Sequence, residues 1–167
     1  MGSKLAIVTG ASTGIGRATV VKLAGQGWKV IAVARREERL RELAEQVGCY
    51  TFTADLTSEK CIRELVKYAA TIGHVDALVN VAGGARGVDA VADAQIDRWK
   101  EMYEINVITA LRMTRAFLPQ MRKSGGTLVF VTSTAAHDTY PGGGGYVAAK
   151  HAERMIPLTL RQELVGE

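Results

Sequence analysis

The chain has 167 residues, of which 47% are hydrophobic and 23% are charged. These proportions are typical of one folded domain with its own core and exclude a disordered chain. The net charge of +4 is mild, and the lysines and arginines are spread along the sequence. This distribution argues against a nucleic-acid surface and suits an anionic small ligand.

The cysteine spacing and the lengths of the apolar runs indicate the cellular compartment. Cys49 and Cys61 form neither a CxxC pair nor a metal-binding spacing, which predicts reduced thiols, no metal site and a cytoplasmic protein. The apolar run near the N-terminus is too short for a signal peptide, and none elsewhere approaches the length of a membrane span. We therefore expect neither a membrane nor a nucleic acid among the partners.

Strand-like and helix-like segments alternate along the chain. Apolar β-branched runs predict strands at residues 4–9, 29–34, 49–54, 76–82 and 126–133. Helical periodicity predicts helices at 17–25, 36–46, 58–72, 97–121 and from Tyr146 onward. This alternation is typical of right-handed βαβ units, so we expect an α/β fold: a doubly wound parallel sheet of the Rossmann type with helices on both faces. No repeat or linker divides it, and residues 1–167 are expected to form one domain.

The glycine-rich segment "TGASTGIG", residues 9–16, joins the first predicted strand to the first helix. Ligands of open α/β sheets bind at the carboxyl ends of strands, and a helix N-terminus attracts a pyrophosphate. The segment therefore predicts a nucleotide site, although tight turns alone also explain many glycine clusters. The candidate residues are Gly10, Ser12, Thr13, Gly14, Ile15 and Gly16.

The end of the second predicted strand indicates which cofactor is preferred. An acidic residue there would bind the free ribose 2′-hydroxyl of NAD, but the sequence has Ala34, Arg35 and Arg36. An arginine suits the 2′-phosphate of NADP. The alternative is a solvated helix face, which fits Arg39 and Arg41 better than Arg35. We expect NADP rather than NAD.

Three polar residues are ambiguous when each is taken alone. Asp55 follows the third strand and either accepts from an adenine amino group or makes a turn. Asn106 lies on the apolar stripe of the long helix and is either functional or a core amide bonded to the backbone. Ser133 ends the fifth strand, where a serine is unremarkable by itself.

Two tyrosines flank the glycines of "YPGGGGYVAAK", residues 140–150. Tyr146 and Lys150 lie one helical turn apart, so their side chains share a face. An ammonium beside a phenol favours the phenolate, which a tyrosine needs for proton transfer near neutral pH. Tyr140 has no basic residue at that spacing and precedes a proline. The alternative is an amphipathic pair on a helix surface, but we expect Tyr146 to be the catalytic phenol.

In combination, the motifs closely resemble the short-chain dehydrogenase/reductase superfamily. They are the glycine loop, Asp55, Asn80-Val81-Ala82-Gly83, Asn106, Ser133 and Tyr146-Val-Ala-Ala-Lys150. The resemblance covers nearly the whole chain. It implies that Ser133 binds the substrate oxygen, Tyr146 transfers the proton, Lys150 binds the nicotinamide ribose and lowers the tyrosine pKa, and Asn106 holds a relay water. It also places Asp55, Leu56, Asn80, Ala82, Gly83, Tyr146 and Lys150 at the cofactor.

The resemblance implies an NADP-dependent oxidoreductase that acts on a small-molecule carbonyl or secondary alcohol. "YPGG" before the tyrosine is similar to 3-hydroxy-acid and serine dehydrogenases of that superfamily. A 3-oxoacyl thioester reductase is a rival enzyme. A non-catalytic NADP-binding sensor or assembly subunit is the alternative from another class.

Three features depart from the family pattern. Val81 replaces a common asparagine, and Pro157 is expected to bend the last helix. Members of the family continue after this helix with further strands and a substrate-covering loop, so we expect the chain to be C-terminally truncated relative to them. A homo-dimer or homo-tetramer is expected through the long helix and the last one. The apolar residues to be covered are Trp99, Tyr103, Phe117, Met155, Ile156 and Leu160.

Overall fold

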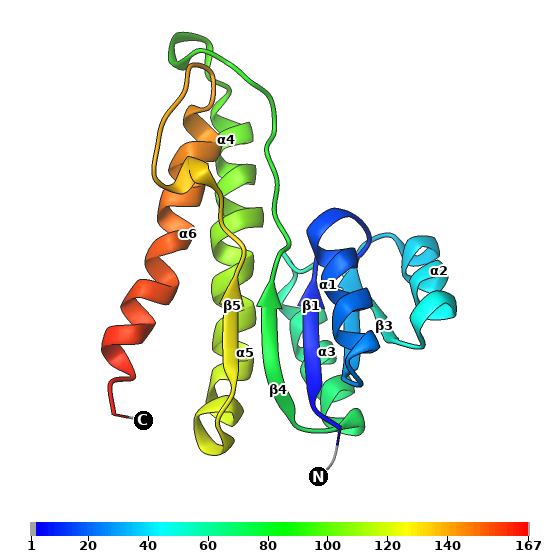
Figure 1. The fold of residues 1–167 in the computed structure, drawn as a ribbon. Helices are drawn as coiled ribbons and strands as arrows, with labels where there is room; N and C mark the ends of the chain where they lie inside the picture. Colours follow the sequence, from blue (N-terminus) through cyan, green and yellow to red (C-terminus); the bar gives the residue numbers. More distant parts are fainter. Residues whose placement is uncertain (1–2, 167) are drawn as a thin grey trace.

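A computed structural model describes residues 3–166 and contains one five-stranded sheet (Figure 1). Its strands are β1 (Leu5–Thr9), β2 (Lys29–Ala34), β3 (Tyr50–Thr53), β4 (Val75–Asn80) and β5 (Thr127–Phe130). They pair in the order β3-β2-β1-β4-β5, and every neighbouring pair is parallel. The predicted Rossmann-type sheet is confirmed, with predicted strands 76–82 and 126–133 ending earlier than expected.

Helices connect the strands. They are α1 (Gly14–Gly25), α2 (Glu37–Val47), α3 (Glu59–Ile72), α4 (Ile96–Tyr103), α5 (Thr109–Ser124) and α6 (Gly144–Glu163). Short turns are η1 (Val91–Asp93) and η3 (Thr134–Ala136), and η2 (Glu104–Ile108) is a π-helical turn. The long helix expected at 97–121 is therefore α4, η2 and α5 in succession, with Asn106 inside the π turn. The hydrophobic pattern does not predict that turn.

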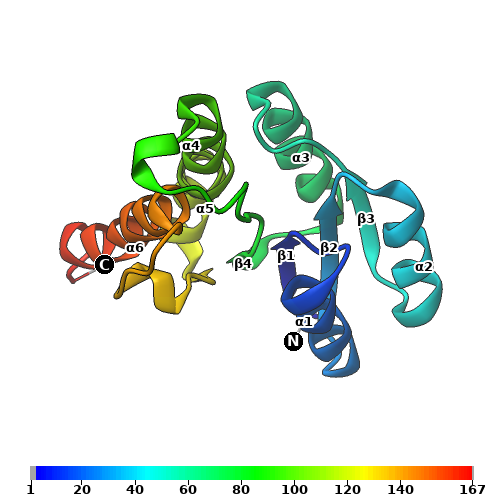
Figure 2. The same ribbon diagram turned by 90° about the horizontal axis from the view of Figure 1, so that it is seen from above.

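Side chains that alternate along the central strands contribute to two hydrophobic cores, one on each face of the sheet. Ile7 and Val33 belong to the core that faces α3 and α5, whereas Val8 and Ala32 belong to the core that faces α1 and α2. Figure 2 shows these two helix layers on opposite sides of the sheet. Successive side chains of a strand point to opposite faces, so each fully apolar strand contributes to both cores.

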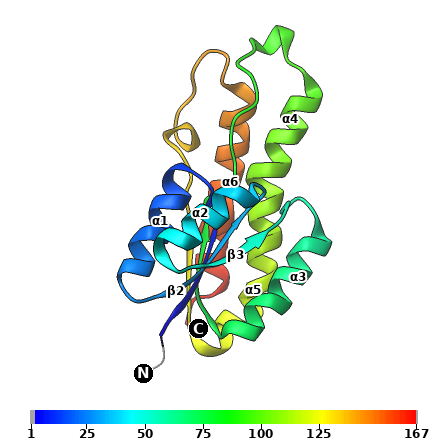
Figure 3. The same cartoon turned by 90° about the vertical axis from the view of Figure 1, so that its right-hand side faces the viewer.

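The β5 side of the sheet is covered less completely. Leu128 and Phe130 are half-buried, and Thr127 and Val129 are exposed. A groove of ≈ 770 Å³ runs beside β5, between the C-terminal parts of α5 and α6. Helix α6 packs on α4 and η2 around a small cluster (Figure 3), whose buried members are Met102, Val107 and Ala149.

One part of the expected association surface was wrong. Phe117 is fully buried in the core beside α3, because it lies on the face of α5 that points to the sheet. Trp99 and Ile156 also pack within the chain, against the cluster between α4 and α6. Tyr103 and Met155 remain 46% and 47% exposed. Association through these two helices stays a prediction.

Two further expectations concern helices. Pro157 lies inside helix α6, which continues to Glu163, and the bend expected at this proline stays a prediction. Among the helices within residues 3–166, none combines the length and the apolar character needed to cross a membrane.

Candidate functional site

A cavity of ≈ 630 Å³ opens at the carboxyl ends of β1, β2 and β4. Many of the predicted cofactor residues line it. They are Gly10, Ser12, Thr13, Ile15, Arg35, Asp55, Leu56, Ala82 and Gly83. Gly14, Gly16, Asn80, Tyr146 and Lys150 are not among its lining residues. The cavity therefore corresponds to one end of the predicted cofactor site, and the predicted catalytic pair lies outside it.

Close backbone contacts shape the glycine loop. Gly10 has a φ of 64°, and a Cβ there would lie 3.0 Å from the Ala82 nitrogen. A Cβ on Gly16 would collide with the Gly10 carbonyl. Glycine is the residue that tolerates both conditions. The glycine spacing therefore reflects tight loop-to-helix and loop-to-loop packing at the cavity floor.

The N-terminus of α1 is open toward an anion. Helix α1 begins at Gly14, its first turn holds no acidic residue, and within residues 3–166 no side chain caps it from Thr13. The first N–H groups of a helix lack intrahelical partners and carry partial positive charge. They can therefore bind a phosphate group.

Two neighbouring arginines behave differently. Arg36 turns back to the glycine loop, and its guanidinium donates to Ser12 Oγ at 2.8 Å and to Thr13 Oγ1 at 2.9 Å. Arg35 is exposed and lines the cavity. Arg36 was expected only as the first residue of the predicted helix 36–46, and its contact with the glycine loop was not predicted. Both neighbouring guanidinium groups, those of Arg35 and Arg36, therefore lie at the cavity.

Asp55 forms a turn at the cavity wall. Its Oδ1 accepts from the Thr57 backbone N–H at 3.0 Å and from the Thr57 hydroxyl at 2.9 Å. The backbone bond from Thr57 is the main cause that holds the Asp55 pKa below its usual value, and the Arg35 charge adds to it. The turn interpretation is confirmed, while a contact with adenine stays a prediction.

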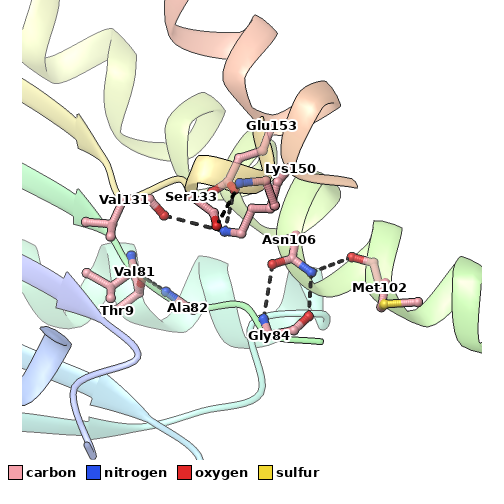
Figure 4. A network of polar contacts seen from close by, with 11 residues as sticks. Thr9, Val81, Ala82, Gly84, Met102, Asn106, Val131, Ser133, Lys150 and Glu153 are labelled. Carbon is pink, nitrogen blue, oxygen red and sulfur yellow. Dashed lines mark hydrogen bonds and ion pairs between the residues drawn. The ribbon is translucent and has the colours of Figure 1, made fainter. Parts of the chain in front are cut away.

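Thr9 ties the ends of two strands together, and the sequence analysis gave it no role. Its hydroxyl accepts from the backbone N–H groups of Val81 at 2.9 Å and Ala82 at 3.0 Å (Figure 4). Its side chain is 1% exposed. The sequence feature that could have indicated this role is a threonine at the end of a buried apolar strand.

Asn80 supplies a test of whether a ligand fits. Within residues 3–166, both side-chain amide atoms of Asn80 are buried without a hydrogen-bond partner. Buried amides are rarely left unsatisfied. The unpaired amide directly precedes Val81, Ala82 and Gly83, which line the cavity. The glycine loop, the open N-terminus of α1 and Arg35 fit an anionic ligand such as a dinucleotide.

Tyr146 and Lys150 lie on α6 as predicted. Lys150 Nζ is 5.9 Å from the centroid of the Tyr146 ring, and the lysine is 3% exposed. Nζ also lies 3.5 Å from the position that a Cβ on Gly83 would occupy. Lys150 therefore connects the tyrosine with the loop that ends the cavity. At 2.6 Å, its nearest partner is Glu153, a residue that the sequence analysis did not select.

Asn106 links the π turn to the loop after β4. Its Oδ1 accepts from the Gly84 N–H at 3.0 Å, and its Nδ2 donates to the carbonyls of Gly84 at 2.9 Å and Met102 at 2.8 Å. The amide is fully buried. This is the core asparagine bonded to backbone that was one of the two alternatives, and a relay water stays a prediction.

Ser133 lies just before η3, and its Oγ accepts from the Ala135 N–H at 3.2 Å. A hydroxyl can donate while it accepts, so this bond leaves the Ser133 proton able to bind a substrate oxygen. Helix α6 packs against η3. Ser133, Tyr146 and Lys150 are therefore carried by segments in direct contact.

The glycines before Tyr146 make room for side chains of the chain itself. A Cβ on Gly143 would collide with the Tyr140 ring, and one on Gly144 would lie 2.9 Å from Trp99. The Tyr140 side chain is 47% exposed. The glycine run thus seats the start of α6 against α4 and the preceding loop.

Arg86 and Thr109 also line the cavity and were not predicted. Arg86 pairs with Glu101 at 2.8 Å. Both residues belong to segments that reach the cavity only through the tertiary fold, and nothing in their local sequence indicates a site.

Comparison with known proteins agrees with this arrangement. The family model described as short chain dehydrogenase matches residues 4–167. An oxidoreductase of Mycobacterium tuberculosis is 49% identical over 165 residues, which cover 98% of this chain and 64% of that protein. An NADP-dependent 3-hydroxy acid dehydrogenase of Escherichia coli (strain K12) is 37% identical over 166 residues, covering 97% of this chain and 67% of that protein.

Solved structures give the same result. A closed form of serine dehydrogenase complexed with NADP+ superposes with a TM-score of 0.93 at 36% identity, covering 97% of this chain and 67% of that one. Serine dehydrogenase from Escherichia coli superposes with a TM-score of 0.92 at 36% identity, covering 97% of this chain and 77% of that one. The chain thus spans about two thirds of the length of the curated relatives, 64% in the Mycobacterium tuberculosis case.

Proposed function

The chain belongs to the short-chain dehydrogenase family, and from that premise we propose that it is an NADP-dependent oxidoreductase. Its substrate is a small carbonyl compound or the corresponding secondary alcohol. The observation that carries the proposal is the placement of Lys150, which is buried 5.9 Å from the Tyr146 ring centroid and beside Gly83. Lys150 is thereby close both to the Tyr146 ring and to the cavity-lining residue Gly83, which supports a site shared by the tyrosine and the cofactor.

The cavity residues divide the cofactor between them in this proposal. The N–H groups of the glycine loop and the start of α1 hold the phosphates, with Gly10, Gly14 and Gly16 allowing close approach. Arg35 holds the ribose 2′-phosphate, and Arg36 keeps Ser12 and Thr13 in place. Leu56 and Asp55 flank the adenine, while Asn80, Ala82 and Gly83 line the path toward the nicotinamide.

When bound, NADP supplies the hydride donor or acceptor, and the side chains of this chain handle the proton. Tyr146 Oη gives a proton to the substrate oxygen during reduction and takes it back during oxidation. The Lys150 ammonium favours the phenolate by charge. Ser133 Oγ donates to the substrate oxygen and orients it. Asn106 holds the loop at Gly84 and through it the floor of this region.

The relatives support a narrower substrate class. Proteins named NADP-dependent 3-hydroxy acid dehydrogenase and serine 3-dehydrogenase match over nearly the whole of this chain. Both names describe a hydroxyl group on the third carbon of an acid, which in serine is a primary alcohol. We propose a substrate of that class for this chain, bound by a homo-dimer or homo-tetramer.

The test is turnover with NADP and a panel of 3-hydroxy acids, simple alcohols and acyl thioesters, with cofactor binding measured in parallel. Oxidation of a 3-hydroxy acid with binding of NADP is the expected result. Preference for the 3-oxoacyl thioesters would replace the substrate class and keep the reaction. Binding of NADP without turnover of any member would overturn the catalytic proposal in favour of a sensor or assembly subunit.

A further inference from the structure

Glu153 is a buried acid that the proposed reaction does not use. Its side chain is 1% exposed, and it lies on α6 close to one helical turn after Lys150. Its Oε2 accepts from Lys150 Nζ at 2.6 Å (Figure 4). An ionised carboxylate is rarely found so deeply buried without a paired charge. The lysine of the proposed site is thus also the counter-ion of a buried acid.

Lys150 lies between two acidic groups of different strength. On one side is Glu153 at 2.6 Å, and on the other is the Tyr146 ring with its centroid at 5.9 Å. The remaining contact of Nζ is long, 3.4 Å to the Val131 carbonyl. The carboxylate is therefore the strongest determinant of where the ammonium lies.

The charged residues on the segments around Glu153 are exposed, have partners of their own or line the groove beside β5. The segments β5 (Thr127–Phe130) and η3 (Thr134–Ala136), which pack on α6, carry no titratable side chain, and His137 after η3 is exposed. The charged residues of α4 and η2 pair elsewhere: Arg98 with Asp89, Lys100 with Asp97, Glu101 with Arg86, and Glu104 with Arg112. Tyr103 of α4 is 46% exposed. On α6 itself, His151 Nδ1 contacts the Val147 carbonyl. Arg154 lines the groove beside β5, and Arg161 and Glu163 are exposed.

We propose that Glu153 is a positioning residue that fixes the place and the charge of the Lys150 ammonium, and through it the pH range in which Tyr146 exchanges its proton. This inference rests on the proposed function of Tyr146 and Lys150. A carboxylate beside the ammonium stabilises the protonated lysine and offsets part of its field at the phenol. Burial raises the Glu153 pKa, and the hydrogen bond from Lys150 opposes that rise.

The pair differs from the surface ion pair of the same spacing. Asp97 and Lys100 are also three residues apart, but their side chains are 95% and 73% exposed. Solvent screens such a pair, so it contributes little free energy. The Lys150 and Glu153 side chains are 4% and 1% exposed. Their coupling should therefore be large enough to measure directly.

The first experiment measures this coupling without turnover. In protein labelled with carbon-13 at lysine, the Lys150 Cε resonance is assigned with the Lys150→Arg variant and titrated in wild type and in Glu153→Gln. We expect the Lys150 pKa to fall by about 1 unit or more in Glu153→Gln, as for loss of an opposite charge within hydrogen-bond distance. The matched control is Glu163→Gln, an exposed carboxylate at the end of α6, which should leave the Lys150 pKa unchanged. An unchanged Lys150 pKa in Glu153→Gln overturns the proposal.

A second measurement uses the wild type and does not depend on the folding of a variant. The Glu153 carboxyl carbon and the Lys150 Cε are followed over the same pH range. A shared inflection supports the pair, and a Lys150 resonance that does not respond when Glu153 titrates overturns it.

The pH profile separates positioning from a merely structural role. In Glu153→Gln, Lys150 should remain protonated at neutral pH, so loss of the carboxylate leaves a more positive site. In the profile of alcohol oxidation rate against pH, the fall in rate on the acid side (the acid limb) should then move to lower pH. A uniform loss of rate with no movement of the limb would indicate a structural role and overturn the inference. If Tyr146→Phe kept its activity, the proposed function would fail, whereas the lysine titration would still decide the coupling.

Discussion

The N-terminal and C-terminal halves of the chain hold their site residues in different ways. In the N-terminal half, residues 3–80, the strands β1 and β2 are almost entirely buried and the cavity is shaped by backbone contacts. In the C-terminal half, residues 81–166, β5 is half-exposed and borders an open groove. There the site residues come from η2, the η3 segment and α6, and side chains such as Asn106 and Lys150 link them.

This difference separates binding from chemistry. The cofactor cavity depends on short stretches of chain whose conformation is set locally by glycine and by buried strands. The proposed chemistry depends on how α6 docks on α4 and η2. Substitutions in the N-terminal half should therefore change cofactor affinity, and those in the C-terminal half should change turnover.

The largest expected effect lies in the C-terminal half. Tyr146→Phe removes the oxygen that we propose transfers the proton and leaves the ring that packs near Met102 and Ala149. We expect turnover to fall about 10²–10⁴-fold, the usual contribution of a general acid–base group. Cofactor affinity, followed by fluorescence titration of NADPH, should be nearly unchanged.

Tyr140→Phe is the matched control for that variant, because Tyr140 lies at the other end of the same glycine run and is 47% exposed. It should keep most of the rate. If Tyr140→Phe were inactive and Tyr146→Phe active, the assignment of the site would be wrong.

The next effect lies in the glycine loop. In Gly16→Ala the added Cβ meets the Gly10 carbonyl, so the loop or the start of α1 must move. Overpacking of this kind typically costs about 1–3 kcal/mol, and we expect both the free energy of unfolding and the NADP affinity to fall. Urea denaturation and cofactor titration measure the two quantities.

Gly25→Ala serves as the control within α1. A Cβ there meets open space, its φ is ordinary, and the residue is exposed. Alanine at such a position should stabilise by about 0.4–1 kcal/mol, because it restricts the unfolded chain. If Gly16→Ala and Gly25→Ala changed the free energy of unfolding and the NADP affinity equally, the glycine loop would not be close-packed.

A smaller effect is expected at the mouth of the cavity. Arg35→Ala should weaken NADP binding about tenfold or more, because it removes the proposed charge-assisted contact with the 2′-phosphate, worth about 1.5–3 kcal/mol. NAD binding should change little, since NAD has no 2′-phosphate. Equal affinity for NAD and NADP in the wild type would contradict the role given to Arg35.

Much of the N-terminal half could be predicted from the sequence, because apolar β-branched runs and glycine spacing act locally. The positions of Gly10, Arg35 and Asp55 at one cavity follow from strand order in a parallel sheet. The contact of Arg36 with Ser12 could not be predicted, since a neighbouring arginine on a charged helix has the same local pattern.

The C-terminal half was predicted in outline only. Spacing placed Tyr146 and Lys150 on one helical face, but it could not show that Glu153 is buried against the lysine. The π turn around Asn106 and the burial of Phe117 also depend on tertiary packing. A periodic stripe of apolar residues does not show whether the core or a partner covers it.

The smallest expected effect is the pH response of Asp55, and it tests whether the N-terminal half is set locally. The Asp55 pKa is lowered mainly by the Thr57 N–H within its own turn, and the Arg35 charge is the smallest of the contributions. Its folded pKa lies below the unfolded value of about 3.9. The ionised carboxylate therefore stabilises the fold above about pH 4, and this contribution is lost as pH falls through the folded pKa. Because Asp55 is exposed, solvent screening should keep the contribution below about 1 kcal/mol.

Urea denaturation of wild type and Asp55→Asn should show a difference in the free energy of unfolding at pH 7 that vanishes in acid. In Arg35→Ala, the carbon-13 shift of the Asp55 carboxyl should still report a lowered pKa, because Thr57 remains. A return of that pKa to its ordinary value in Arg35→Ala would show that the distant charge, and not the local turn, controls this part of the site.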